Sequence, residues 1–202
     1  MASQFNIYSV LKNPEKKRKP LSNTRKRTYW TRLFYVLVIL LSVLLQNTPH
    51  LFPTIMGCHA WLLIPLVVCI AMFEKDLSAV LLAALAGAFW DAALAWGDGF
   101  HALLFAVFAS GIALLMNYLM RNNLKTALLL SGTALLLYSV LDWLIFSVAR
   151  HVPGSGMLYV TFYLPSAAYS FLFTAVYYIL LRKFLRKMRE KYPRKEILED
   201  HP

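Results

Sequence analysis

Charged residues are scarce in this 202-residue chain, and acidic residues are the scarcest of them. Asp, Glu, Lys and Arg make up 15% of the chain, whereas a soluble domain carries about 25%. Hydrophobic residues make up 59%, and the mean hydropathy is +0.54. This composition excludes an ordinary water-soluble domain. It predicts an integral membrane protein whose length allows one helix bundle and two tails.

Sequence motifs of enzymes and of cofactor-binding proteins are also missing. The chain has no phosphate-binding glycine loop, no dinucleotide-binding fingerprint and no serine-nucleophile motif. The two cysteines, Cys58 and Cys69, are eleven residues apart on one predicted helix, too far apart for a disulfide. The five histidines follow no spacing typical of metal ligands. We therefore predict no catalytic residue, no cofactor and no metal site.

Positive charge is concentrated at the two ends of the chain. Of 21 Lys and Arg residues, nine lie in residues 1–32 and eight in residues 182–202. Basic segments beside apolar spans indicate contact with anionic lipid and a defined membrane orientation, rather than binding to nucleic acid. We predict a disordered basic tail over residues 1–28, a transmembrane domain over 29–182 and a basic cytoplasmic end over 183–202.

Six apolar runs have the length and composition expected of membrane-spanning helices. Pro65 is expected to kink the second run, and the last run is expected to continue as a basic amphipathic helix. If both termini are cytoplasmic, 20 of the 21 Lys and Arg residues lie inside and only Arg150 lies outside. The fold prediction is therefore an all-α multi-pass bundle of six transmembrane helices with cytoplasmic termini. The runs are about Tyr29–Leu45, Ile55–Phe73, Leu77–Trp96, Phe100–Met120, Thr126–Val148 and Leu158–Leu181.

The third run contains a single carboxylate, Asp91, near its middle. A charge there costs about 2.5–3.5 kcal/mol on membrane-insertion scales, so it indicates a function or a helix contact. Ala79, Ala83 and Gly87 recur every four residues and lead along the helix to Asp91. Small residues at that spacing allow a neighbouring backbone to approach closely. We predict that Asp91 points into protein, and that a turn ending at Gly99 follows this helix.

A second carboxylate, Asp142, lies within the fifth run at a depth similar to that of Asp91. Two membrane carboxylates could form the pair of an intramembrane aspartyl peptidase, in which one activates water while the other holds a proton. The Gly-x-Gly-Asp sequence typical of such enzymes is absent around Asp91. The alternative is that each carboxylate bonds to a neighbouring helix or caps a backbone amide.

Four short segments, in their order and spacing, resemble the bacterial rod shape-determining protein MreD family. The resemblance extends from about Leu33 to Lys187. It implies structural or interaction roles for Gly87, Asp91, Gly99 and Pro165, to which we add Asp142. The segments are Gly87-Ala88-Phe89-Trp90-Asp91, Gly99-Phe100-His101-Ala102-Leu103, His50-Leu51-Phe52-Pro53 after the first span, and Leu164-Pro165 at the start of the last.

The resemblance implies a non-enzymatic scaffold subunit of the machinery for cell elongation and peptidoglycan synthesis in the bacterial cell membrane. The family works with the bitopic protein MreC, the actin-like protein MreB, and a SEDS-type glycosyltransferase with its penicillin-binding partner. It also resembles the six-helix substrate-binding subunits of energy-coupling-factor transporters. A transporter subunit with a ligand pocket near Asp91 and Asp142 is therefore the alternative function. The few polar side chains in the spans favour the scaffold.

Overall fold

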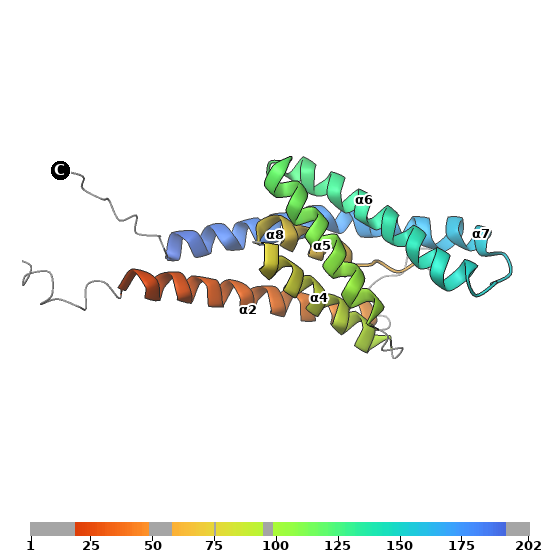
Figure 1. Ribbon diagram of the computed structural model, residues 1–202, viewed down its shortest axis with the longest axis horizontal. Helices are drawn as coiled ribbons and strands as arrows, with labels where there is room; N and C mark the ends of the chain where they lie inside the picture. The colour runs from red at the N-terminus through yellow and green to blue at the C-terminus, as the bar shows by residue number, and fades with distance from the viewer. Residues whose placement is uncertain (1–18, 49–57, 75, 95–98, 193–202) are drawn as a thin grey trace, which may run out of the picture. The chain divides into compact units, whose positions relative to one another are not determined.

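The computed structural model describes residues 19–48, 58–74, 76–94 and 99–192. All regular elements in these residues are helices (Figure 1). The π-helical turn η1 continues α6, and α7 and η2 lead directly into α8, so these elements form six helical segments. The elements are α2 (Lys19–Asn47), α3 (Leu63–Phe73), α4 (Asp76–Ala93), α5 (Phe100–Tyr118), α6 (Leu124–Asp142), η1 (Trp143–Val148), α7 (Ser155–Leu158), η2 (Tyr159–Tyr163) and α8 (Leu164–Lys191).

The chain divides into two compact units, and α2 and α8 contribute to both. The larger unit is Tyr35–Arg182, and the smaller combines Met1–Phe34 with Lys183–Pro202. In the smaller unit the Phe34 and Phe184 rings are stacked, with centroids 3.6 Å apart. In the larger unit Ser42 Oγ lies 2.8 Å from the Tyr177 hydroxyl oxygen. The first helix and the last helix therefore contact each other within each unit.

Four helices in the described part of the chain are long and apolar enough to cross a membrane. They are Arg25–Asn47, Phe100–Tyr118, Leu124–Val148 and Ser155–Lys191. The helices Leu63–Phe73 and Leu77–Ala93 are apolar but shorter. The regular structure of the described residues is therefore all-helical, as expected of an integral membrane protein of this composition. The count of six spans and the orientation of the termini stay predictions.

The second predicted span is wrong in its extent, because α3 has only 11 residues. At ~1.5 Å per residue it is ~17 Å long, about half the thickness of the hydrocarbon core. Residues 58–62 are not helical, and residues 55–57 lie outside the described part of the chain. Pro65 does not kink a longer helix as predicted. It is the third residue of α3, where a missing N–H leaves no hydrogen bond unmade.

Protein rather than lipid surrounds α3, since ten of its 11 residues are buried. A buried helix needs partners for the polar groups at its ends. Gln46 Oε1 accepts a hydrogen bond from the Leu62 N–H at 2.9 Å, and Ser170 Oγ accepts one from the Trp61 N–H at 2.7 Å. At the other end Asn122 Nδ2 donates to the Met72 carbonyl oxygen at 3.0 Å. Side chains from three other segments therefore hold α3 at the centre of the larger unit.

The helix at the N-terminal end begins earlier than predicted. α2 starts at Lys19, so residues 19–28, predicted to be disordered, are helical. Lys and Arg are good helix formers, and a helix already nucleated in an apolar span extends readily into them. Pro20 lies in the first turn, where proline is tolerated. Residues 1–18 and 193–202 of the two predicted basic ends lie outside the described residues.

Candidate functional site

Asp91 caps the beginning of α5 from a neighbouring helix. It lies near the end of α4, and its Oδ1 accepts a hydrogen bond from the His101 N–H at 3.2 Å. Its Oδ2 accepts one from the Ala102 N–H at 3.1 Å. The first N–H groups of a helix have no acceptor within the helix and carry partial positive charge. The carboxylate therefore satisfies two such groups where water cannot, since Asp91 is only 7% exposed.

Gly87 makes this capping contact possible. A Cβ at residue 87 would lie 2.4 Å from the His101 carbonyl oxygen and 2.5 Å from the Ala102 N and Cα atoms. These atoms belong to the first turn of α5, which Asp91 also caps. Asp91 lies one helical turn beyond Gly87 on α4. Ala79 and Ala83 of the small-residue stripe are fully buried. The close approach of the two helices therefore needs a residue without a side chain at position 87.

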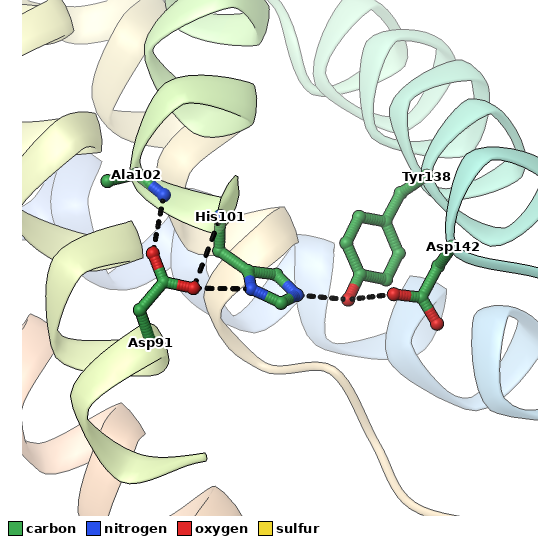
Figure 2. A network of polar contacts seen from close by, with 5 residues as sticks. All are labelled: Asp91, His101, Ala102, Tyr138 and Asp142. Atoms are coloured by element: carbon green, nitrogen blue, oxygen red, sulfur yellow. Dashed lines mark hydrogen bonds and ion pairs between the residues drawn. The ribbon is translucent and has the colours of Figure 1, made fainter. Parts of the chain in front are cut away.

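A chain of polar side chains links Asp91 to Asp142. Figure 2 shows His101 between Asp91 and Tyr138, with Asp142 on the far side of Tyr138. His101 Nδ1 lies 2.6 Å from Asp91 Oδ1, and His101 Nε2 lies 3.1 Å from the Tyr138 hydroxyl oxygen. The Tyr138 hydroxyl lies 3.4 Å from Asp142 Oδ1. The chain crosses from the α4–α5 hairpin to α6.

Two arrangements of protons fit these distances. With a neutral imidazole, His101 donates through Nδ1 to Asp91, and the Tyr138 hydroxyl donates to Nε2. With a charged imidazolium, His101 donates through both nitrogens, and the Tyr138 hydroxyl donates to Asp142. Adding one proton to His101 therefore changes which neighbour the Tyr138 hydroxyl donates to, without moving the backbone.

Aromatic rings enclose the polar chain and restrict the His101 ring. Trp90 is stacked on His101, with ring centroids 5.2 Å apart and an interplanar angle of 6°. Trp61 and Phe105 each lie against Tyr138, with ring centroids at 5.1 and 6.4 Å. His101 is 4% exposed. In these apolar surroundings hydrogen bonds are stronger than in water, and breaking one is correspondingly costly.

Asp142 is less enclosed than Asp91 and borders a cavity of about 300 Å³. It lies at the junction of α6 and η1. The cavity is lined by Asp91 of α4, by His101 of α5, and by Asp142, Phe146 and Arg150 at and beyond the end of α6. Such π-helical turns are rare and occur often at functional sites. The cavity and the polar chain together form the candidate site.

The other two residues singled out from sequence lie at backbone junctions. Gly99 immediately precedes α5 with φ +68°, a left-handed conformation that glycine adopts at no steric cost. Pro165 is the second residue of α8, directly after η2. Proline cannot donate to the carbonyl four residues earlier, that of Thr161. The Cys58 thiol lies 3.5 Å from that carbonyl oxygen instead. Gly99 lies at the capped end of α5, whereas Pro165 is not among the residues that line the cavity.

The family model for rod shape-determining protein MreD matches residues 26–188. The chain belongs to the MreD family. The match spans α2 to α8 and includes every residue of the candidate site. No curated protein and no solved structure matches the chain. Membership identifies a rod shape-determining membrane protein, as the sequence resemblance implied.

In this MreD-family chain the two carboxylates do not bond to each other. His101 and Tyr138 lie between them, and both Asp91 oxygens accept hydrogen bonds from the backbone of α5. An aspartyl dyad requires two carboxylates that share one proton and one water. The capping alternative raised for Asp91 describes its contacts better. Within the described residues, no three His, Cys, Asp or Glu side chains converge as metal ligands would.

Sequence reasoning did not single out His101 and Tyr138 as site residues. His101 stands in the segment that resembles the family, and Tyr138 lies four residues before Asp142, on the same face of the helix. Tyr138 contacts a residue 37 positions away. Nothing local in the sequence indicates that pairing.

Proposed function

We propose that this chain is a non-catalytic membrane subunit of the bacterial cell-elongation complex. The observation that supports this most directly is the family match over residues 26–188. The charge asymmetry supports a multi-pass position in the cell membrane with both termini in the cytoplasm. In this role the chain binds an MreC-like bitopic protein, and through it an MreB-like actin and a SEDS-type glycosyltransferase with its penicillin-binding partner.

The contacts of Asp91 support a structural role for this carboxylate. It joins the end of α4 to the beginning of α5 with two backbone hydrogen bonds and reaches α6 through His101 and Tyr138. A buried acceptor whose donors are all matched stabilises one arrangement of helices and penalises others. A partner that binds these helices then meets a preformed surface and loses less conformational entropy on binding.

The basic helix ends are proposed to bind anionic lipid at the cytoplasmic surface. In the smaller unit, α8 carries exposed Arg186, Lys187 and Arg189 beyond the ring stack of Phe34 and Phe184. Each Lys or Arg near an anionic surface contributes about 1 kcal/mol. The same charges can orient the complex toward an acidic cytoplasmic partner.

The cavity beside Asp142 favours the second candidate, a substrate-binding subunit of an energy-coupling-factor type transporter. A volume of about 300 Å³ is at the lower limit for ligand sites. The family match favours the elongation function over this alternative.

Co-purification distinguishes the two functions. The full-length chain, tagged at its C-terminus and expressed at native level in its own bacterium, is extracted in mild detergent, and the associated chains are identified by mass spectrometry. We expect a bitopic coiled-coil protein and the cell-wall synthases. Recovery of a transporter's energising subunits and ATPases in their place would reject the elongation role. A tagged unrelated multi-pass protein of similar abundance controls for unspecific recovery.

A further inference from the structure

The cavity of the larger unit has opposite charges on one wall. Tyr138, Asp142, Phe146 and Arg150 recur every four residues, and all four line it. In an α-helix residues four apart drift slowly round the axis, because a turn holds 3.6 residues. The π-helical turn η1 holds more residues per turn and reverses that drift. This local irregularity is what brings the carboxylate and the guanidinium to the same face.

The Arg150 side chain contacts Phe146, which lies between Arg150 and Asp142 in the sequence. The Arg150 guanidinium lies over the Phe146 ring, with its carbon 5.1 Å from the ring centroid. Phe146 is one turn beyond Asp142, so the wall presents a carboxylate, an aromatic ring and a guanidinium in succession.

The remaining lining residues supply aromatic surface but little additional charge. Trp61, Trp90 and Phe100 are among them. The Asp91 carboxylate and His101 also border the cavity, but their polar atoms bond to each other, to α5 and to Tyr138. Asp142 and Arg150 are the other two charged residues of the lining, and a ligand in the cavity meets both. A simple cation would be repelled by Arg150, and a simple anion by Asp142.

We propose that the cavity binds a small zwitterion in which an ammonium group lies against Asp142 and the aromatic rings, while a phosphate group faces Arg150. Aromatic faces attract cations, and a carboxylate adds a charged acceptor. The planar guanidinium matches phosphate geometry. Arg150 is exposed and follows the end of the span-length helix Leu124–Val148, so we expect it at the level where lipid phosphates lie. Phosphoethanolamine has this chemistry, either free or as the head group of a phospholipid.

Calorimetric titration of the purified full-length chain in maltoside detergent tests the proposal. The probes are O-phosphoethanolamine, ethanolamine, inorganic phosphate and glycine betaine. We expect O-phosphoethanolamine to bind at least about tenfold more tightly than each other probe, because only it engages both charges. If ethanolamine binds as tightly as O-phosphoethanolamine, the cavity is a plain cation site. If betaine binds more tightly than O-phosphoethanolamine, the ligand carries a carboxylate. If neither O-phosphoethanolamine nor the phospholipid binds, the cavity holds no such ligand. Each of these three results would overturn the proposal.

Substitutions locate the binding within the structure. Asp142→Asn and Arg150→Gln should each weaken binding by about tenfold, the loss of one charged hydrogen bond. Arg121→Gln is the matched control, because Arg121 is also exposed but precedes α6 at its other end. Arg150 is exposed, so Arg150→Gln should fold and decides the outcome even if Asp142→Asn does not. Unchanged binding in Arg150→Gln would refute the site.

An experiment in membranes distinguishes a phospholipid ligand from a soluble one. The chain is placed in nanodiscs of phosphatidylglycerol alone or mixed with phosphatidylethanolamine, and lipid retained after detergent release is counted by native mass spectrometry. Retention of phosphatidylethanolamine by the unmodified chain but not by Arg150→Gln identifies a lipid ligand. Binding of free O-phosphoethanolamine without such retention identifies a soluble one.

Discussion

Gly87→Ala should destabilise the α4–α5 hairpin although it adds only one methyl group. The new Cβ would lie 2.4–2.5 Å from backbone atoms of His101 and Ala102. Carbon contacts are comfortable at about 3.5 Å, so the first turn of α5 must retreat by about 1 Å. The Asp91 hydrogen bonds to this turn are 3.1 and 3.2 Å long, and a shift of that size breaks both.

The magnitude follows from the bonds that are lost. Two hydrogen bonds to a charged acceptor are worth about 1.5–3 kcal/mol each. Alanine restores about 1 kcal/mol through its better helix propensity. The net loss should be about 2–5 kcal/mol, which lowers the melting temperature by on the order of 10 °C. Tryptophan fluorescence in detergent reports it, because Trp90 is stacked on His101.

Gly111→Ala is the matched control for this prediction. Gly111 lies on α5, and a Cβ there would meet no atom within 4 Å. That substitution should be neutral or stabilise the protein by up to about 1 kcal/mol. Equal melting temperatures for the two alanine variants would refute the proposed close approach. Adding Asp91→Asn to Gly87→Ala should cost less than the sum of the single changes, because both act on the same bonds.

Three further predictions concern the capping carboxylate, the topology and the basic tail. Asp91→Asn keeps one of two acceptor oxygens and should retain partial complementation of rod shape, whereas Asp91→Leu should fail at equal membrane abundance. Complete failure of the Asn variant with normal abundance and intact partner recovery would instead favour proton chemistry. Single cysteines placed at Asn47 and Gly154 should react with an impermeant reagent added outside the cell, whereas a cysteine at Lys125 should react only from inside. Labelling of position 125 from outside would contradict the six-span topology. Deleting residues 1–18 should leave the melting temperature unchanged and weaken binding to anionic vesicles, and a lower melting temperature would show that this stretch supports the fold.

Local sequence patterns predicted the class of the molecule and the position of its main polar group. Hydropathy and charge patterns depend on local composition, so they predicted an all-helical membrane protein and the helix Phe100–Tyr118 to within two residues. The cost of a charge in an apolar helix led to Asp91, and the four-residue spacing of small side chains led to Gly87. The family resemblance was visible for the same reason, since it consists of short local segments.

The groups that these residues contact became known only from the folded chain. Hydropathy cannot distinguish burial in protein from burial in lipid, so α3 read as a span although protein encloses it. The helix start that Asp91 caps lies ten residues further along the chain, and Tyr138 comes from another helix, 37 residues beyond His101. The cavity depends on a π-helical turn, and no residue pattern reveals where such a turn will form. These features arise from packing between distant segments, where small changes in helix position decide which atoms come within bonding distance.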